Sequence, residues 1–282
     1  MVTFQTTEST DEQIFAALNP MVAGWFRQKF KKFSPPQKFA VMDIHKRKNV
    51  LVSAPTGSGK TLSAFAAIIS ELVNLSEAQK LEDKVYCVYI SPLKALNNDI
   101  KRNLLEPLKE IEEVNAKELG LRVLVRTEDT TAYERQKMLA KPPHILITTP
   151  ESLAILLVAP KFREKLRDVK WVVVDEIHAL ASGKRGVHFS LSLERLQNIA
   201  GPFTRIGLSA TIAPLDEIAQ FLAGFENDGQ PREISVVDAQ FLKKMDLKVI
   251  SPVENIMDVT QADLDKKTYE MLGRGDTMGV FQ

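Results

Sequence analysis

Short apolar runs rich in β-branched residues alternate along the chain with stretches of helical periodicity. Six runs have the pattern of strands buried on both faces, at residues 50–54, 85–91, 121–125, 144–148, 171–175 and 205–209. Helical patterns cover residues 62–73, 93–108, 133–139, 153–158 and 189–199. The alternation predicts an α/β fold whose mainly parallel, twisted sheet is sandwiched by helices in three layers. Ligands of such sheets bind beyond the carboxyl ends of the strands, so chemistry is expected there.

The segments that flank this pattern are also predicted to be structured. Before residue 50 come two or three short helices, one of which starts with the capping-box pair Thr10 and Gln13. After Pro214 we expect one more helix and a seventh strand at residues 233–237. The glycine-rich stretch at residues 273–279 has no periodicity and is expected to be mobile.

Composition narrows the class of protein without identifying it. The 282 residues are 44% hydrophobic and 26% charged, which excludes a wholly disordered chain and allows about two domains. The formal net charge of +1 means that any nucleic-acid binding must come from local patches. The single cysteine, Cys87, cannot form an intrachain disulfide. No apolar stretch reaches the ~18 residues of a membrane span, and the polar start is unlike a signal peptide, so we expect a cytoplasmic chain with no membrane partner.

A glycine-rich turn, Ala54-Pro-Thr-Gly-Ser-Gly-Lys-Thr61, follows the first predicted strand and leads into a helix. Its backbone N–H groups, the helix N-terminus and the Lys60 ammonium favour the β- and γ-phosphates of a nucleotide. Thr61 would place a hydroxyl on Mg²⁺. The strict pattern has glycine at position 54, and a merely flexible turn is the alternative interpretation. The predicted nucleotide-binding residues are Thr56, Gly57, Ser58, Gly59, Lys60 and Thr61.

A second motif is the apolar strand that ends in Asp175-Glu-Ile-His178. Asp175 can reach a Mg²⁺ held by Thr61, while Glu176 can polarise a water for in-line attack on the γ-phosphate. Taken alone, such a strand end is more often an ordinary loop start. The catalytic set predicted from both motifs is Glu176, Asp175 and Lys60.

Three more polar residues lie near these strand ends. His178 alone is commonly a hydrogen-bonded loop residue, and Ser209 and Thr211 in Gly207-Leu-Ser-Ala-Thr211 alone favour helix caps. Together they predict a coupling segment, in which Ser209 or Thr211 bonds to residues 175–178.

Two strands end alike, in Ser91-Pro-Leu-Lys94 and Thr149-Pro-Glu-Ser152. A hydroxyl residue caps a helix and proline takes its first position, which leaves free N–H donors that suit anions. The alternative interpretation of each is simply a well-made helix start. Two on one edge, with basic residues nearby, suggest a track for a phosphodiester backbone. The basic and aromatic residues 26–33 and the run Lys46-Arg-Lys48 form a weaker candidate patch, because charge runs are usually solvated helix faces.

In this order the motifs resemble those of the first motor domain of superfamily 2 helicases of the DEAD/DExH kind, over about residues 20–250. Residues 183–196 make the chain similar to the Lhr-like (large helicase-related) group. The resemblance implies a RecA-like P-loop NTPase fold with ATP and Mg²⁺ as cofactors. Alanine at position 54 is usual in these helicases. The resemblance further implies that Gln37, in Phe33-Ser-Pro-Pro-Gln37, contacts adenine. The nucleic-acid contacts that it implies are Pro92, Lys94, Thr149, Pro150, Glu151, Arg185 and Gly186.

The resemblance also implies a division of the chain. We expect a helical extension at residues 1–35, a RecA-like ATP-binding domain at 36–240 and a partly mobile linker at 241–282 that leads towards a second RecA-like domain missing from this chain. Such helicases need the second domain for arginine fingers. We therefore expect a half-motor that hydrolyses ATP slowly and unwinds nothing alone. Isolated half-motors are commonly monomers, so we expect a monomer, and the resemblance favours DNA over RNA as the track.

Two other functions fit parts of the sequence. A P-loop phosphotransferase for small molecules would need an arginine-rich lid, which the sequence lacks. A non-catalytic nucleic-acid-binding fragment would carry a vestigial nucleotide site, against which the intact Lys60, Asp175 and Glu176 argue.

Overall fold

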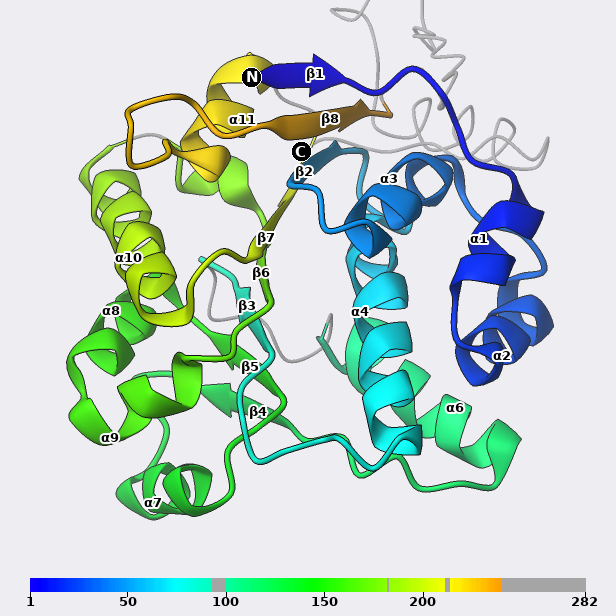
Figure 1. Ribbon diagram of the computed structural model, residues 1–282, viewed down its shortest axis with the longest axis horizontal. Coiled ribbons are helices and arrows are strands. Elements are labelled where there is room, and N and C mark those ends of the chain that lie inside the picture. Colours follow the sequence, from blue (N-terminus) through cyan, green and yellow to red (C-terminus); the bar gives the residue numbers. More distant parts are fainter. Residues whose placement is uncertain (93–99, 182, 211–213, 240–282) are drawn as a thin grey trace, which may run out of the picture. The chain divides into compact units, whose positions relative to one another are not determined.

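The computed structural model describes residues 1–92, 100–181, 183–210 and 214–239 and has an eight-stranded sheet at its centre (Figure 1). Every pair of neighbouring strands is parallel, in the order β1-β8-β2-β7-β6-β3-β5-β4. The predicted α/β class is confirmed, and all six predicted runs and the predicted seventh strand lie in the sheet. The strands are β1 (Val2–Phe4), β2 (Val50–Ser53), β3 (Cys87–Ile90), β4 (Val123–Arg126), β5 (Ile145–Thr148), β6 (Trp171–Val174), β7 (Thr204–Ser209) and β8 (Ile234–Asp238).

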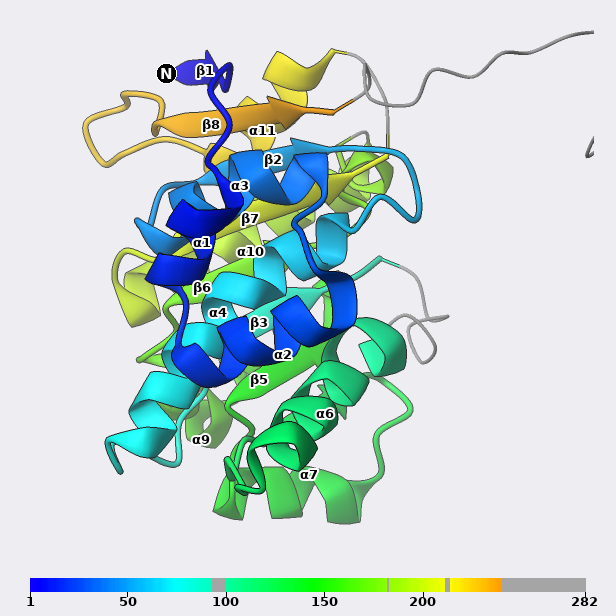
Figure 2. The same cartoon turned by 90° about the vertical axis from the view of Figure 1, so that its right-hand side faces the viewer.

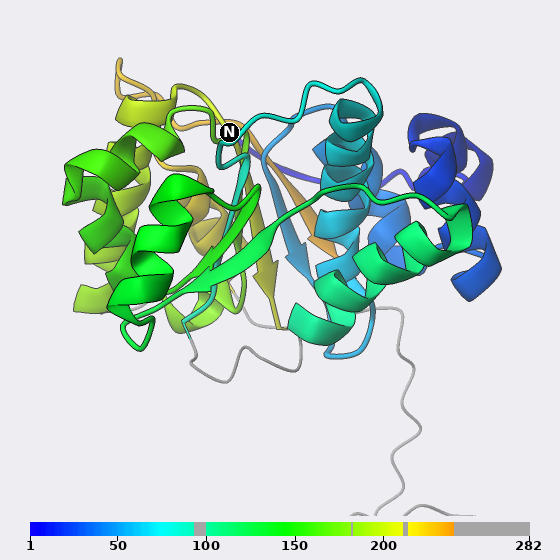
Figure 3. The same cartoon turned by 90° about the horizontal axis from the view of Figure 1, so that it is seen from below.

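Helices cover both faces of this sheet, as Figure 3 shows from below. One face carries α1 (Asp11–Ala17), α2 (Pro20–Phe30), α3 (Pro35–His45), α4 (Lys60–Glu77) and α6 (Glu106–Asn115), which lie in front of the strands in Figure 2. The other face carries α7 (Ala132–Ala140), α8 (Pro150–Val158), α9 (Pro160–Arg163), α10 (Lys184–Ala200) and α11 (Leu215–Ala223). Within the described ranges, no helix is long and apolar enough to cross a bilayer.

The strand side chains divide between two apolar clusters, one on each face of the sheet. Val173 packs in the cluster beneath α4, whereas its neighbours Val172 and Val174 pack in the cluster beneath α8 and α10. All three are fully buried, and each such side chain contributes roughly 1.5–3 kcal/mol to stability. Burial on both faces explains why the strands are continuous apolar runs rather than alternating ones.

The start of the chain differs from the prediction, which placed only helices before residue 50. Val2–Phe4 forms β1, whose backbone pairs in parallel with β8. Only the first of these three residues is partly buried and the other two are exposed, so the segment has no buried apolar run that a sequence pattern could reveal. The predicted helical extension therefore also supplies a strand, which covers the edge of β8.

The predicted helix at residues 93–108 differs as well. Residues 93–99 lie outside the described part of the chain, and Lys101–Leu105 forms a π-helical turn, η1, before α6 begins at Glu106. Pro107 has no N–H for the carbonyl four residues earlier, which favours the wider turn. The predicted linker at residues 241–282 also lies outside the described residues.

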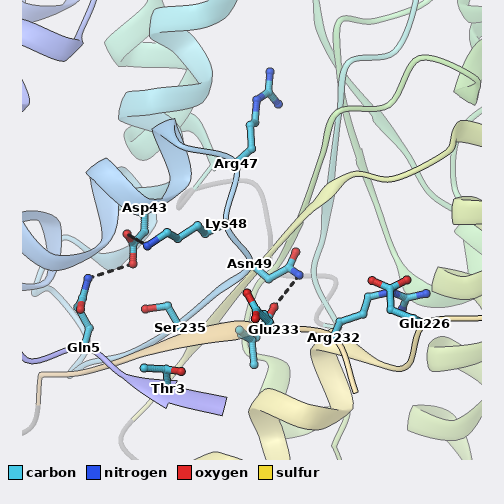
Figure 4. A pocket seen from close by; sticks show the side chains of 11 residues that line it. Thr3, Gln5, Asp43, Arg47, Lys48, Asn49, Glu226, Arg232, Glu233 and Ser235 are labelled. Atoms are coloured by element: carbon cyan, nitrogen blue, oxygen red, sulfur yellow. Dashed lines mark hydrogen bonds and ion pairs between the residues drawn. The ribbon is translucent and has the colours of Figure 1, made fainter. Parts of the chain in front are cut away.

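A shallow polar groove of about 530 Å³ lies at the amino-terminal ends of β2 and β8 (Figure 4). Its side chains largely satisfy one another: Asp43 accepts from Gln5 at 3.1 Å and pairs with Lys48 at 3.2 Å, and Asn49 donates to the Glu233 carbonyl at 2.9 Å. Since β2 runs from this end towards residues 54–61, the groove is separate from the predicted nucleotide site.

Candidate nucleotide-binding site

The glycine-rich turn joins the carboxyl end of β2 to the start of α4. Gly57 and Gly59 have φ values of 78° and 87°, in the left-handed region that favours glycine. A Cβ on Gly59 would lie 2.8 Å from the Gln37 amide nitrogen, so no side chain fits there without displacing Gln37. The loop therefore has the strand, glycine turn and helix N-terminus of an anion-binding cradle.

Lys60 begins α4 and turns its side chain back over this loop. The side chain is buried, and its ammonium donates to the Ala54 carbonyl at 3.3 Å. The same Nζ lies 3.9 Å from Oε1 of Glu176. The structure thus brings two residues 116 positions apart in the sequence into one corner at the carboxyl ends of β2 and β6.

Asp175 directly follows β6, and both oxygens of its carboxyl group are held. Oδ1 accepts from the Glu176 amide at 2.9 Å, and Oδ2 accepts from the hydroxyl of Tyr89 on β3. Burial raises the pKa of Asp175, and the hydrogen bond from Tyr89 opposes that rise. The two fixed oxygens give the carboxylate a defined orientation next to Lys60 and Glu176.

Glu176 has an unusual backbone for a residue with a side chain. Its φ of 46° and ψ of 41° lie in the left-handed region, which costs a non-glycine residue roughly 1–2 kcal/mol. The short 3₁₀ turn η3 (Ile177–Ala179) begins immediately afterwards. The chain therefore leaves β6 by a sharp turn, at which the Glu176 side chain stays about one-third exposed while Asp175 is largely buried.

His178 connects Glu176 to the end of β7. Its Nε2 lies 3.4 Å from Oε2 of Glu176, and its Nδ1 lies 3.3 Å from Oγ of Ser209. The backbone N–H of Ala210 also donates to Nδ1, at 3.4 Å, so this nitrogen is an acceptor and Nε2 carries the proton in the neutral ring. Ser209 therefore contacts the segment 175–178 through His178. Thr211, the other residue predicted to bond to this segment, lies outside the described residues.

Gln37 lies in the first turn of α3 and is almost fully buried. Its side-chain oxygen accepts from the Ser34 amide at 2.8 Å, and its side-chain nitrogen donates to the Gly59 carbonyl at 3.3 Å. The residue is therefore attached to the glycine-rich loop. Its predicted contact with adenine stays a prediction.

Several predicted nucleic-acid contacts gather at the carboxyl ends of β3 and β5. Thr149 caps α8, where its hydroxyl accepts from the Ser152 amide at 3.2 Å and Pro150 takes the first position. Arg185 at the start of α10 pairs with Glu151 and donates to the Pro92 carbonyl at 2.9 Å. The pairing lowers the pKa of Glu151. Lys94, the remaining predicted contact on this edge, lies outside the described residues.

Gly186 has a packing reason to be glycine. A Cβ at this position would lie 1.8 Å from the Leu180 carbonyl oxygen, so α10 can approach the preceding turn only without a side chain there. The predicted contact of Gly186 with nucleic acid stays a prediction.

The aromatic residues of the basic stretch at 26–33 are largely core residues. The rings of Phe26 and Phe33 stack with centroids 4.1 Å apart and are almost fully buried. Arg27 covers the ring of Phe15 at 4.2 Å, and Lys29 pairs with Glu110 at 2.5 Å. These contacts favour the structural interpretation of this stretch over a nucleic-acid patch.

Tyr89 is the site residue that sequence reasoning missed. It occupies the middle of a buried β-branched run in which an aromatic residue is ordinary, so no motif distinguishes it. The only signal is chemical: a hydroxyl in a strand buried on both faces needs a partner.

Comparison with known proteins agrees with this geometry. A model of the family described as "DEAD/DEAH box helicase" matches residues 34–219, more than half of the chain. The chain is 59% identical to an ATP-dependent helicase Lhr-Core protein 2 of Thermococcus barophilus and 56% identical to an ATP-dependent helicase Lhr-Core of Methanothermobacter thermautotrophicus, in each case over 96% of the chain. The resemblance to the Lhr-like group that the motifs indicated is confirmed.

A solved structure of Mycobacterium smegmatis helicase Lhr bound to ssDNA and AMP-PNP is similar with a TM-score of 0.73 and 38% identity. It is matched over 93% of this chain and 33% of that one. The chain spans about a third of the length of the curated relatives from T. barophilus and M. thermautotrophicus.

Proposed function

Because this chain belongs to the DEAD/DEAH box helicase family, we propose that it is the first ATP-binding motor domain of an ATP-dependent nucleic-acid helicase. The observation that carries the proposal is the corner at the carboxyl ends of β2 and β6, where Lys60 Nζ lies 3.9 Å from Glu176 Oε1. A phosphate-binding loop and a carboxylate pair meet there, which is what hydrolysis of a nucleoside triphosphate requires.

The loop residues would hold the phosphates of ATP. Backbone N–H groups between Thr56 and Thr61 and the N-terminus of α4 are donors for the β- and γ-phosphates, and the Lys60 ammonium adds a full positive charge. Gln37, fixed to the Gly59 carbonyl, would contact adenine.

The donor set fits Mg²⁺. Thr61 offers a hydroxyl and Asp175 a carboxylate held by two hydrogen bonds. Mg²⁺ usually keeps several waters and takes one or two protein carboxylates together with phosphate oxygens, so this small donor set would be sufficient beside a bound nucleotide. Mg²⁺ would neutralise charge that develops on the phosphates during transfer.

Glu176 is the candidate base. Its partly exposed carboxylate can accept a proton from water as the water oxygen bonds to the γ-phosphorus and the bond to the bridging oxygen breaks. His178 contacts both Glu176 and Ser209, so a change in the contacts of this carboxylate would be transmitted to the end of β7.

The strand ends at Pro92 and Thr149 would bind the backbone of a nucleic acid. Contacts of this kind position the strand without reading its bases. Arg185 holds this edge together through Glu151 and the Pro92 carbonyl. We infer DNA as the track, which the ssDNA-bound Lhr structure at 38% identity supports. We also infer that a second RecA-like domain supplies an arginine, which contributes about 10³–10⁵ in rate, so ATP turnover would be slow without that domain.

A titration with a fluorescent, slowly hydrolysed ATP analogue in Mg²⁺ tests the proposal. We expect saturable binding that Lys60→Ala weakens strongly. Lys117→Ala is the matched control, because Lys117 pairs with Glu77 at 3.0 Å at the far end of α4. Equal binding by the parent chain and Lys60→Ala would refute a nucleotide site in this loop.

Two further measurements separate a motor from the alternatives. Glu176→Gln should keep analogue binding and lose ATP turnover, whereas a vestigial site would show no change. Single-stranded DNA should tighten analogue binding by the parent chain, which a small-molecule phosphotransferase would not show.

A further inference from the structure

Tyr89 lies on β3 beside β6 and faces the cluster beneath α4. Its backbone is in register with Val173, two residues before Asp175, and its ring packs against Phe65 of α4 with centroids 5.5 Å apart. The side chain is 1% exposed. The ring is thus fixed between the sheet and the helix that begins at Lys60.

The fixed ring places its hydroxyl beside Oδ2 of Asp175. The hydroxyl donates to Oδ2 of Asp175, while Oδ1 accepts from the Glu176 amide. Without the tyrosine hydroxyl, the hydrogen bond to the Asp175 carboxyl group would come from the next residue in the chain, Glu176. One bond to one oxygen allows the carboxyl group to rotate about its terminal bond.

We propose that Tyr89 is a positioning residue whose hydroxyl holds the Asp175 carboxylate in the orientation that binds a nucleotide-bound divalent cation. The inference rests on the proposed ATP-binding function. Partners that orient a metal-binding carboxylate typically contribute about 10–100-fold to metal affinity. A packing role alone would need only the ring, because phenylalanine fills nearly the same space against Phe65.

The hydroxyl deletion Tyr89→Phe tests this directly. The quantity to measure is the factor by which Mg²⁺ tightens binding of the fluorescent ATP analogue, relative to binding in excess EDTA. We expect Tyr89→Phe to bind as the parent chain does in EDTA and to lose about tenfold of this factor. In an Asp175→Asn background, Tyr89→Phe should change nothing further.

Tyr86→Phe is the matched control, because it deletes a buried hydroxyl just before the same strand. That hydroxyl accepts from the Glu82 amide at 3.0 Å, at the amino-terminal end of β3. Thermal unfolding of both variants checks that they are folded. Binding of Mn²⁺ in the presence of the analogue, followed by electron paramagnetic resonance, gives a second readout that does not depend on turnover.

The outcomes are distinct. A Mg²⁺ factor for Tyr89→Phe equal to that of Tyr86→Phe would overturn the positioning role and leave the proposed function intact. Equal weakening of Tyr89→Phe in Mg²⁺ and EDTA would also overturn it, because the hydroxyl would then shape the pocket rather than the metal ligand. If the parent chain itself shows no Mg²⁺-dependent binding, the proposed function fails and the inference fails with it.

Discussion

The guanidinium of Arg185 lies 2.6 Å from Oε1 of Glu151, and it donates a further hydrogen bond to the Pro92 carbonyl. All three residues were predicted to contact nucleic acid, yet the structure shows them in contact with one another. Arg185 therefore ties the end of β3 and the start of α8 to the start of α10. A guanidinium has five N–H donors, so this pairing still leaves donors for a phosphate.

We predict that Arg185 acts on nucleic-acid binding mainly through this pairing. Arg185→Ala and Glu151→Ala should each weaken binding of fluorescent single-stranded DNA by up to about fivefold, since both side chains are partly exposed and such pairs contribute about 0.2–1 kcal/mol. The double variant should lose no more than either single variant. Fluorescence anisotropy at several salt concentrations measures these affinities.

The exposed pair Arg167 and Glu164 provides the control, because it lies before β6, at the opposite end of the sheet. Alanine at either position should leave DNA binding unchanged. If Arg185 instead acted as a direct phosphate ligand, Arg185→Ala would lower the salt slope by about one and Glu151→Ala would tighten binding.

A second prediction concerns the backbone of Glu176. Glu176→Gly should raise the free energy of unfolding by about 1 kcal/mol, because glycine adopts the left-handed conformation without the cost paid by a residue with a Cβ. The same change should abolish ATP turnover, so that stability and activity change in opposite directions. Urea unfolding and a phosphate-release assay measure the two effects.

Ala116, at the end of α6, has the same φ of 46° and ψ of 41° and lies away from the candidate site. Ala116→Gly should therefore give the same gain in stability and keep nucleotide binding and turnover. A gain for Ala116→Gly without one for Glu176→Gly would mean that contacts of the Glu176 side chain offset its backbone strain.

The packing of Gly186 leads to a third prediction. Gly186→Ala should lower the free energy of unfolding by about 1–3 kcal/mol, because its Cβ would meet a backbone oxygen that no side-chain rotation can move. Gly24→Ala in α2 should raise stability by roughly 0.5–1 kcal/mol, since a Cβ there meets nothing within 4 Å. A Gly186→Ala chain of unchanged stability with weaker DNA binding would restore the role predicted from sequence.

The parts of the fold that sequence reasoning predicted correctly are those with a local signal. Residues 50–54 and 171–175 are apolar runs followed by glycine or paired acids, and both are strands that end at the candidate site. The three residues of β1 carry no such signal, because their position depends on backbone bonds to β8, more than 200 residues away.

The residues of the candidate site also differ in whether a local sequence signal identifies them. Motifs identify the loop before Lys60 and the acids after β6, because each function needs several adjacent residues. The link from Tyr89 to Asp175 and the pairing of Arg185 with Glu151 join residues 86 and 34 positions apart. Such contacts depend on which strands become neighbours, and a single sequence does not encode that locally.

A last prediction concerns pH and His144, which lies just before β5 and is 1% exposed. Its Nδ1 accepts from the Arg122 amide at 3.1 Å, and burial, assisted by the charge of Arg122, lowers its pKa from 6.5 to about 4. Because the pKa is lower in the folded than in the unfolded chain, the unfolded state binds the proton first as pH falls. The contribution of neutral His144 to the free energy of unfolding is therefore fully present above about pH 6.5. It is lost as the pH falls towards 4, by up to about 3 kcal/mol.

Urea unfolding between pH 7 and 4.5 measures this loss, and His144→Asn isolates it. Asparagine keeps a side-chain acceptor for the Arg122 amide and does not titrate, so the variant should lose less stability than the parent chain over this range. His45→Asn removes an exposed histidine on α3, so this variant should lose as much stability as the parent chain over the same pH range. Parallel loss of stability in the parent and His144→Asn would show instead that carboxyl groups dominate the acid response, because they are the other groups that protonate as the pH approaches 4.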